Sequence, residues 1–323
     1  MNKANQVLKA KRCIKKILSI KTAFKILGYV KVNFPKDEKM IKRMERQIKC
    51  SNRLEVYSND VVRSMFCKQK TCLICNSIRL AKFLDKYLDE ITKGTILYHI
   101  VLTVRNPQHK QLKKTINKMY GFFRNSAINK NKDYRELNKK VKMIRSFEAT
   151  LNESANTYHI HFHILLASKN EQEVNIYGNL LIEYWMKYFG DKAHKDAQYL
   201  EKQERSILEN FKYLFKMNDI SDNNISMVYH LLKALEGKRL FLAKNIKLDK
   251  EKIRELKSKK YNDIENAKID QTFRYHKEDK NWIDDLTGEI FVIDNDYEKL
   301  KQENTEKKNK RNSSYSTKKQ SKN

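Results

Sequence analysis

The strongest constraint on the fold lies in residues 157–167, which read TYHIHFHILLA. Aromatic and β-branched residues are typical of a β-strand, in which successive side chains point to opposite faces. One face of this strand would carry His159, His161 and His163, and the other face would be apolar. Residues 143–151 form a similar run, and the turn-rich cluster 152–156 separates the two. The sequence therefore predicts a β-hairpin with one apolar face and one histidine-bearing face.

The segments before and after this hairpin have apolar residues at helical spacing, and residues 95–104 are predicted to form one further buried strand. The low content of Gly (7) and Pro (2) favours long, continuous elements. We therefore expect an α+β fold, with a small central antiparallel sheet flanked by helices. The predicted helices lie within 1–49 and at about 78–91, 111–127, 171–190, 201–217 and 223–236.

The expected organisation has five regions. They are a basic helical N-terminal region (1–49), a cysteine-rich segment with a helix (50–94), a sheet-bearing domain (95–248), a charged C-terminal region (249–300) and a disordered basic tail (301–323). The tail has the composition of a nonspecific DNA-tethering arm.

The charge balance points to a polyanionic partner. The chain has 68 Lys and Arg against 39 Asp and Glu, a formal net charge of +29. Contacts with phosphates would account for this excess, because each contact releases a condensed counterion. Codon bias in an AT-rich genome is the alternative explanation. No apolar run is long enough for a membrane span and no signal peptide is visible, so we expect a soluble, cytoplasmic protein without a membrane partner.

The histidine face predicts a metal site. If Asn152 pairs with Thr157, then Glu148 lies opposite His161 on the same face of the hairpin. Two imidazoles and one carboxylate, with open positions for water and phosphate oxygens, suit Mn²⁺ or Mg²⁺. The alternative role for Glu148 is to orient a histidine ligand. A metal beside a basic surface indicates phosphodiester chemistry.

A second cluster is formed by Cys50, Cys67, Cys72 and Cys75, four of the five cysteines. Thiolates at such spacing favour a tetrahedral, structural Zn²⁺, although the arm to Cys50 is unusually long. Free buried cysteines are the alternative.

Glu209 and Tyr213 are four residues apart and would share one face of a helix, with Lys212 and Lys216 beside the tyrosine. A phenol near cations and a bound phosphate can act as a nucleophile, and a carboxylate one turn away can act as a general base. By spacing alone, such a pair is more often an ordinary surface feature.

Taken in order, these segments resemble the rolling-circle replication initiators (Rep proteins) of small bacterial plasmids, which are His-hydrophobe-His (HUH) endonucleases. The segments that carry the resemblance read IVLTV (100–104), YHIHFHILL (158–166), ENFKYLFK (209–216) and ALEGKR (234–239). The family usually has Pro where Ile160 stands, which changes nothing chemical.

The resemblance implies that Tyr213 is the nucleophile, that Glu209 acts in termination, and that His161 and His163 hold a divalent metal. His159 would be an extra ligand or a phosphate contact. The resemblance also implies a sheet similar to RNA-recognition-motif folds. The expected activity is nicking of origin DNA, single-stranded or in a hairpin, through a 5′-phosphotyrosine intermediate.

The sequence contains no phosphate-binding loop, so we expect a host helicase and the host replication machinery to act with the protein. The alternatives are a single-tyrosine transposase or relaxase, and a non-enzymatic, zinc-containing regulator that binds nucleic acid.

Overall fold

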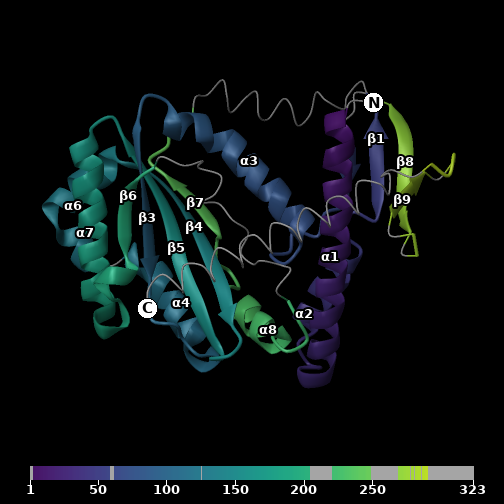
Figure 1. Ribbon diagram of the computed structural model, residues 1–323, viewed down its shortest axis with the longest axis horizontal. Helices are drawn as coiled ribbons and strands as arrows, with labels where there is room; N and C mark the ends of the chain where they lie inside the picture. Colours follow the sequence, from purple (N-terminus) through teal and green to yellow (C-terminus); the bar gives the residue numbers. More distant parts are fainter. Residues whose placement is uncertain are drawn as a thin grey trace, which may run out of the picture.

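The computed structural model describes residues 3–58, 62–124, 126–203, 220–248, 268–276, 278–279, 281–284 and 286–289. Two antiparallel sheets and the helices around them confirm the expected α+β class. The larger sheet has the order β6-β3-β5-β4-β7 and the smaller sheet has the order β2-β1-β8-β9. In Figure 1 the two sheets lie at opposite ends of the molecule, with helix α1 (Lys3–Asn33) beside the smaller one.

The larger sheet is built around the predicted hairpin. Its strands are β3 (Ile96–Thr103), β4 (Lys142–Asn152), β5 (Thr157–Ser168), β6 (Tyr199–Lys202) and β7 (Phe241–Lys244). Asn152 pairs with Thr157, as expected, and the register continues to Met143 opposite Leu166. Asn156 closes the turn with a φ of 49°, a left-handed conformation that Asn tolerates.

One face of this sheet carries the main core. Ile160, Phe162 and Ile164 of β5 are fully buried there. Three helices supply the opposing apolar side chains: α4 (His109–Phe122), α7 (Glu171–Phe189) and α8 (Ile225–Ala234). Short helices α5 (Ser126–Lys130) and α6 (Lys132–Lys140) precede β4, and single 3-10 turns at Gly190–Lys192 and Lys195–Ala197 precede β6.

The opposite face divides into two halves along each strand. At one end, Ile144, Leu165 and Ala167 pack under helix α3 (Leu73–Thr92), which crosses this face in Figure 1. At the other end of the same strands stand His161 and His163. Because side chains alternate along a strand, a single register fixes both the apolar contact with α3 and the histidine cluster.

The smaller sheet joins segments far apart in the chain. Strands β1 (Arg53–Tyr57) and β2 (Val62–Ser64) form a hairpin, and β1 also pairs with β8 (Ile269–His276), which pairs with β9 (Asn281–Asp284). Its core contains Phe273, Trp282 and the cysteines. No strand is predicted from the sequence at residues 269–284, because their alternation is weak and β1, which joins β8 to the sheet, is more than two hundred residues away.

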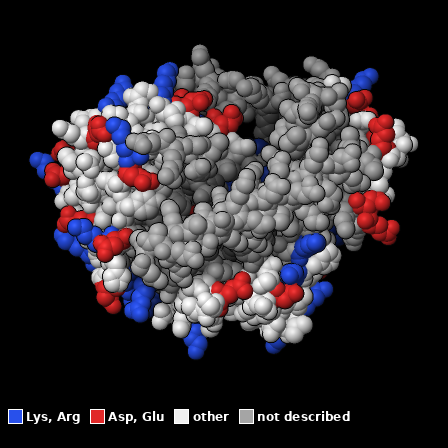
Figure 2. All heavy atoms as spheres, in the orientation of Figure 1, with Lys and Arg blue, Asp and Glu red and all other residues white. Residues whose placement is uncertain are grey.

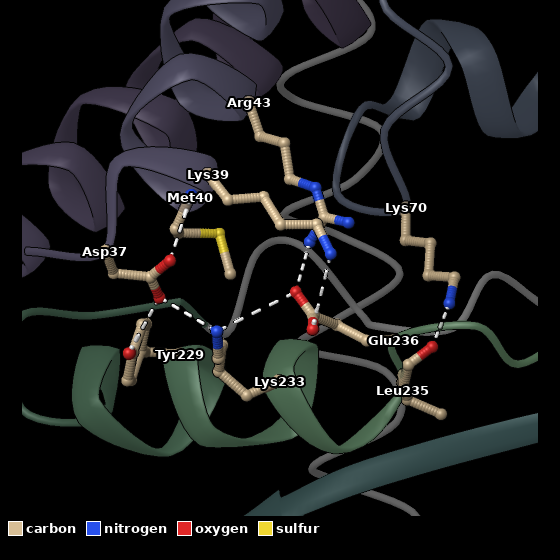
Figure 3. A network of polar contacts seen from close by, with 9 residues as sticks. All are labelled: Asp37, Lys39, Met40, Arg43, Lys70, Tyr229, Lys233, Leu235 and Glu236. Atoms are coloured by element: carbon tan, nitrogen blue, oxygen red, sulfur yellow. Dashed lines mark hydrogen bonds and ion pairs between the residues drawn. The ribbon is translucent and has the colours of Figure 1, made fainter.

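Helix α2 (Glu38–Ile48) connects the two parts of the molecule through a polar network (Figure 3). Arg43 contacts Glu236 at 2.6 Å, and Lys233 contacts Asp37 at 3.0 Å. Lys70, from the cysteine-bearing loop, donates to the carbonyl of Leu235. These contacts fix the segment that follows α8 against both α2 and the cysteine-bearing loop.

The helix expected over 201–217 is wrong at its start, because residues 199–202 pair with the edge of β3 as strand β6. The rest of that expected helix and the expected tail at 301–323 lie outside the described residues.

Candidate metal centres

Glu148, His161 and His163 converge on one point of the larger sheet. Nε2 of His163 lies 2.9 Å from Nε2 of His161 and 3.0 Å from Oε2 of Glu148, and the third distance, from His161 to Glu148, is 3.6 Å. The register places Glu148 directly opposite His161, as the sequence predicts. Three potential ligand atoms on two paired strands are therefore held together by backbone hydrogen bonds rather than by a flexible loop.

The spacing of these three atoms fits a divalent ion. Ligands about 2.1 Å from an octahedral ion are separated by about 3.0 Å when they occupy adjacent positions. The observed separations of 2.9, 3.0 and 3.6 Å are close to that value. Nδ1 of His161 is buried and, among the described residues, has no hydrogen-bond partner. Two imidazoles and a carboxylate suit Mn²⁺ or Mg²⁺, of which Mg²⁺ is the chemically harder cation.

The electrostatics of the cluster favour a charged carboxylate. Burial alone would raise the pKa of Glu148, but hydrogen bonds and charge from His161 and His163 outweigh it and hold this pKa well below its ordinary value. Glu148 is therefore ionised at neutral pH and is ready to bind a cation without first losing a proton.

His99 of β3 supports this centre, and the sequence analysis does not identify it. Its Nε2 lies 3.0 Å from Nδ1 of His163, and its Nδ1 faces Oε1 of Glu201 at 3.6 Å. Burial lowers the pKa of His99 to about 4, with the charge of His163 acting in the same direction. Nε2 of a neutral His99 can accept a hydrogen bond from Nδ1–H of His163, which leaves Nε2 of His163 free to bind a metal. The strand pairing, which aligns His99 with Leu165 on the histidine face, is the signal that would have found it.

His159 has a different environment from its two neighbours. It is exposed, and its Nδ1 lies 3.2 Å from Oδ1 of Asn106. Its ring lies beside that of His161, tilted by 39° with centroids 4.8 Å apart, but it is not part of the three-ligand cluster. An exposed imidazole at the edge of the centre can contact an anionic group that approaches from solvent.

The four predicted cysteines lie together, packed against the smaller sheet. Cys50 is 3.6 Å from both Cys72 and Cys75, and Cys67 is 3.6 Å from Cys75, measured between sulfurs. A tetrahedral Zn²⁺ with bonds of about 2.3 Å requires sulfurs separated by about 3.8 Å. The cluster therefore has the dimensions of a Zn²⁺ site, and the long arm to Cys50 is accommodated by the β1–β2 hairpin.

Backbone amides surround these sulfurs. The amide of Cys67 points to the sulfur of Cys50 at 3.4 Å, and the amide of Lys68 to the sulfur of Cys75 at 3.2 Å. Lys68 has a φ of 57°, and this left-handed turn directs the amide inward. Amide donors stabilise thiolates, so the loop is arranged for ionised rather than neutral sulfur.

Lys16 of α1 is a buried cation next to the cysteines. Its Nζ donates to the carbonyl of Cys50 and, at 2.7 Å, to Oδ1 of Asn52. Burial lowers its pKa to about 8, whereas the nearby thiols raise it. Four thiolates and one Zn²⁺ carry a net charge of −2, and Lys16 offsets part of it.

The residues expected to perform strand cleavage, Glu209, Tyr213, Lys212 and Lys216, lie outside the described residues. Among the described helices, none is long and apolar enough to cross a lipid bilayer. On the side of the molecule seen in Figure 2, Lys and Arg side chains are interspersed with Asp and Glu over the half that carries the larger sheet.

A sequence model of the replication protein family matches residues 58–284. The "Protein rep" of Streptococcus pneumoniae serotype 2 is 30% identical over 174 residues, which cover 48% of this chain and 48% of that protein. The "Protein rep" of Bacillus amyloliquefaciens is 25% identical over 243 residues, covering 62% of this chain and 69% of that protein.

A "Protein rep" from a Bacillus species is 26% identical over 243 residues, which cover 62% of this chain and 76% of that protein. The chain thus spans about half the length of the S. pneumoniae relative, and 69% and 76% of the other two. No solved structure matches the chain. Because the family match covers more than half of the sequence, this chain belongs to the replication protein family, the rolling-circle plasmid replication initiators.

Proposed function

We propose that this protein starts plasmid replication by nicking one strand at the origin and remaining attached to the 5′ end through a tyrosine. The observation that carries the proposal is the convergence of Glu148, His161 and His163, whose potential ligand atoms lie within 3.6 Å of one another, in a chain that belongs to this family. Family membership supplies the class of substrate, and the three ligands supply a place for the chemistry.

The nicking centre would hold Mn²⁺ or Mg²⁺ through Glu148, His161 and His163. When bound, the metal would polarise a non-bridging oxygen of the scissile phosphate. The protein's own residues prepare the site: His99 keeps the Nε2 lone pair of His163 available, and His159 stands at the exposed edge where a DNA phosphate would arrive.

In the proposed step, the phenolate oxygen of Tyr213 forms a bond to phosphorus, and the bond from phosphorus to the 3′ oxygen breaks. The departing oxygen takes a proton and becomes the free 3′-hydroxyl that primes synthesis. The positive charges of Lys212 and Lys216 would favour the ionised phenol. In termination, Glu209 would remove a proton from the attacking hydroxyl that releases the new strand.

The remaining parts of the chain would support this reaction. The cysteine cluster, loaded with Zn²⁺, would hold residues 50–75 and 268–289 together beside the nuclease domain at 95–248. The basic tail at 301–323 would keep the protein near DNA. The reaction would take place in the cytoplasm, with strand separation supplied by a host helicase.

Isolation of a covalent protein–oligonucleotide adduct tests the proposal. The full-length protein is incubated with Mn²⁺ and supercoiled plasmid carrying the cognate origin, or with an oligonucleotide spanning the nick site. We expect an adduct that maps to Tyr213. Tyr213→Phe should abolish both adduct and nicking, whereas Tyr188→Phe, on α7, should leave both unchanged.

Three results would contradict the proposal. Nicking by Tyr213→Phe at the wild-type rate would show that another group is the nucleophile. Tight origin binding without nicking in any divalent metal would instead support the alternative of a non-enzymatic, zinc-containing regulator that binds nucleic acid. Preferential cleavage of transposon ends or a transfer origin would support the transposase or relaxase alternative.

A further inference from the structure

Strand β7 forms one edge of the larger sheet, and a pocket lies on each side of it. The first pocket, of about 520 Å³, lies between β4, β7 and the end of α4. The second, of about 610 Å³, lies between β7, α3 and the cysteine-bearing loop. Lys238, Arg239 and Leu242 line both pockets, so the two adjoin at β7 and the segment that precedes it. We call these two adjoining pockets the β7 groove.

Cations line the β7 groove from one end to the other. The first pocket has five: Arg124, Arg145, Lys238, Arg239 and Lys244. The second pocket adds five more: Lys68, Lys70, Arg79, Lys82 and Lys86. No Asp or Glu is among the described residues that line either pocket. The lining of the groove is therefore uniformly positive, unlike the face seen in Figure 2, where positive and negative side chains are mixed. A uniformly positive groove is complementary in charge to a polyanion.

Arg145 lines the first pocket and is only 6% exposed. Its guanidinium carbon lies 4.1 Å from the ring centre of Phe123, 4.6 Å from that of Phe162 and 5.3 Å from that of Tyr120. No carboxylate of the described residues forms an ion pair with it. The aromatic rings hold the cation in place, but a buried charge without a counter-ion is costly, and an anion in the pocket would remove that cost.

The segment between the two pockets is held firmly. The hydroxyl of Tyr120 donates to the carbonyl of Arg239 at 2.8 Å, and Gly237 supplies a left-handed turn with a φ of 69°. Lys70 binds the carbonyl of Leu235, and Arg43 binds Glu236, as Figure 3 shows. The cations of the groove are thus presented by a prearranged backbone, which lowers the entropic cost of binding.

We propose that the β7 groove binds single-stranded DNA through its phosphates, and that one phosphate reaches Arg145. The choice of DNA as the polyanion rests on the proposed function. The first pocket is a different surface from the nicking centre: Arg145 and Glu148 are three residues apart on β4 and therefore point to opposite faces of the sheet. The second pocket lies between α3 and β7, on the face that carries the histidines but at the other end of the strands. The groove would hold a strand at the β7 edge of the sheet while the nicking centre carries out cleavage.

We infer single-stranded rather than double-stranded DNA because Arg145 is recessed below the protein surface. The phosphates of a duplex lie on a stiff, convex surface and meet exposed cations. An unpaired strand is flexible, and its backbone can bend into a pocket of about 520 Å³ to reach a side chain that is 6% exposed. The volume lies within the range of small-ligand sites, which is enough for a nucleotide.

The test measures binding of a fluorescein-labelled oligothymidylate to the full-length, zinc-loaded protein at several salt concentrations, without Mn²⁺ or Mg²⁺. The main variant is Lys238→Gln/Arg239→Gln, because both side chains reach solvent. Arg145→Met is the second variant, used with a thermal melt to confirm folding. Lys130→Gln/Lys132→Gln removes the same charge from exposed positions outside the groove and is the matched control.

We expect the Lys238/Arg239 variant to bind about tenfold or more weakly than the control, since each charged phosphate contact contributes that order of affinity. Its salt dependence should fall by about 1.4 in log–log slope, for two phosphate contacts on a single strand. Arg145→Met, if folded, should show a similar loss of affinity. Binding to a duplex of equal length should change much less.

Two outcomes would overturn the inference: a loss no larger than that of the control, or a larger loss for duplex than for the oligothymidylate. The adduct assay on the same preparations separates the two proposals. If the wild type forms the adduct and the groove variants bind oligothymidylate as tightly as the control does, the nicking function stands and the groove proposal is rejected. If the wild type forms no adduct but the groove variants lose oligothymidylate binding, the groove proposal stands and the nicking function is rejected.

Discussion

His99 offers a sharp test of the metal centre, because it contacts a ligand without being one. His99→Leu removes the acceptor that lies 3.0 Å from Nδ1 of His163, in a position where the side chain is 4% exposed. Nδ1 of His163 then has no partner, and a buried donor without an acceptor costs about 1–3 kcal/mol. The His163 ring also loses the contact that keeps its proton on Nδ1 and leaves the lone pair on Nε2 available.

Loss of a group that orients a histidine ligand typically weakens metal binding by about 10–100-fold, or about 1.4–2.7 kcal/mol. We expect His99→Leu to fall in this range for Mn²⁺, measured by titration calorimetry after the cysteine site is saturated with Zn²⁺. His99→Gln, which retains an acceptor oxygen, should recover part of the affinity. His194→Leu, at an exposed position, is the matched control.

The reasoning would be refuted if His99→Leu bound Mn²⁺ within twofold of the wild type while remaining fully folded. A double variant adds a second check. In a His163→Ala background, the His99→Leu change should have little further effect on Mn²⁺ affinity, because the contact it removes is already absent. Additive losses would show that His99 acts on the centre by some other route.

Cys72→Ser should abolish binding of one Zn²⁺ per chain and destabilise the smaller sheet, seen as metal content and as protease cleavage within 268–289; unchanged metal content would contradict the assignment. Asp37→Asn should cost about 1–2 kcal/mol at neutral pH, because it removes the ion pair with Lys233. Although burial raises the pKa of Asp37, contacts with Lys233 and Tyr229 hold it below its ordinary value, so this stability is present above about pH 4 and disappears as pH falls further. Urea denaturation at two pH values measures it, and an equal cost at pH 3 would refute it. Gly178→Ala should cost about 1–3 kcal/mol by thermal melting, since the added carbon would lie 2.8 Å from the side chain of Leu200; an unchanged melt would show that Leu200 moves aside.

The sequence by itself determined the elements with strong local periodicity. The hairpin of β4 and β5, its register and the resulting pairing of Glu148 with His161 follow from the alternation of side chains and from the turn at 152–156. The four cysteines and the long helices were similarly predictable, because a ligand pattern or an apolar stripe is written in neighbouring residues. The family relationship also rests on these local segments.

Tertiary structure decided what depends on distant pairing. Strand β8 pairs with β1, more than two hundred residues earlier, as well as with its neighbour β9, and residues 199–202 form β6 because the edge of β3 binds them. His99 becomes a support for His163 through the pairing of β3 with β5, and Arg145 becomes a recessed cation through packing against α4. Side-chain alternation is a local property, whereas burial and the choice of a strand partner belong to the folded chain. The histidine face could therefore be predicted from sequence, but its supporting histidine and the β7 groove could not.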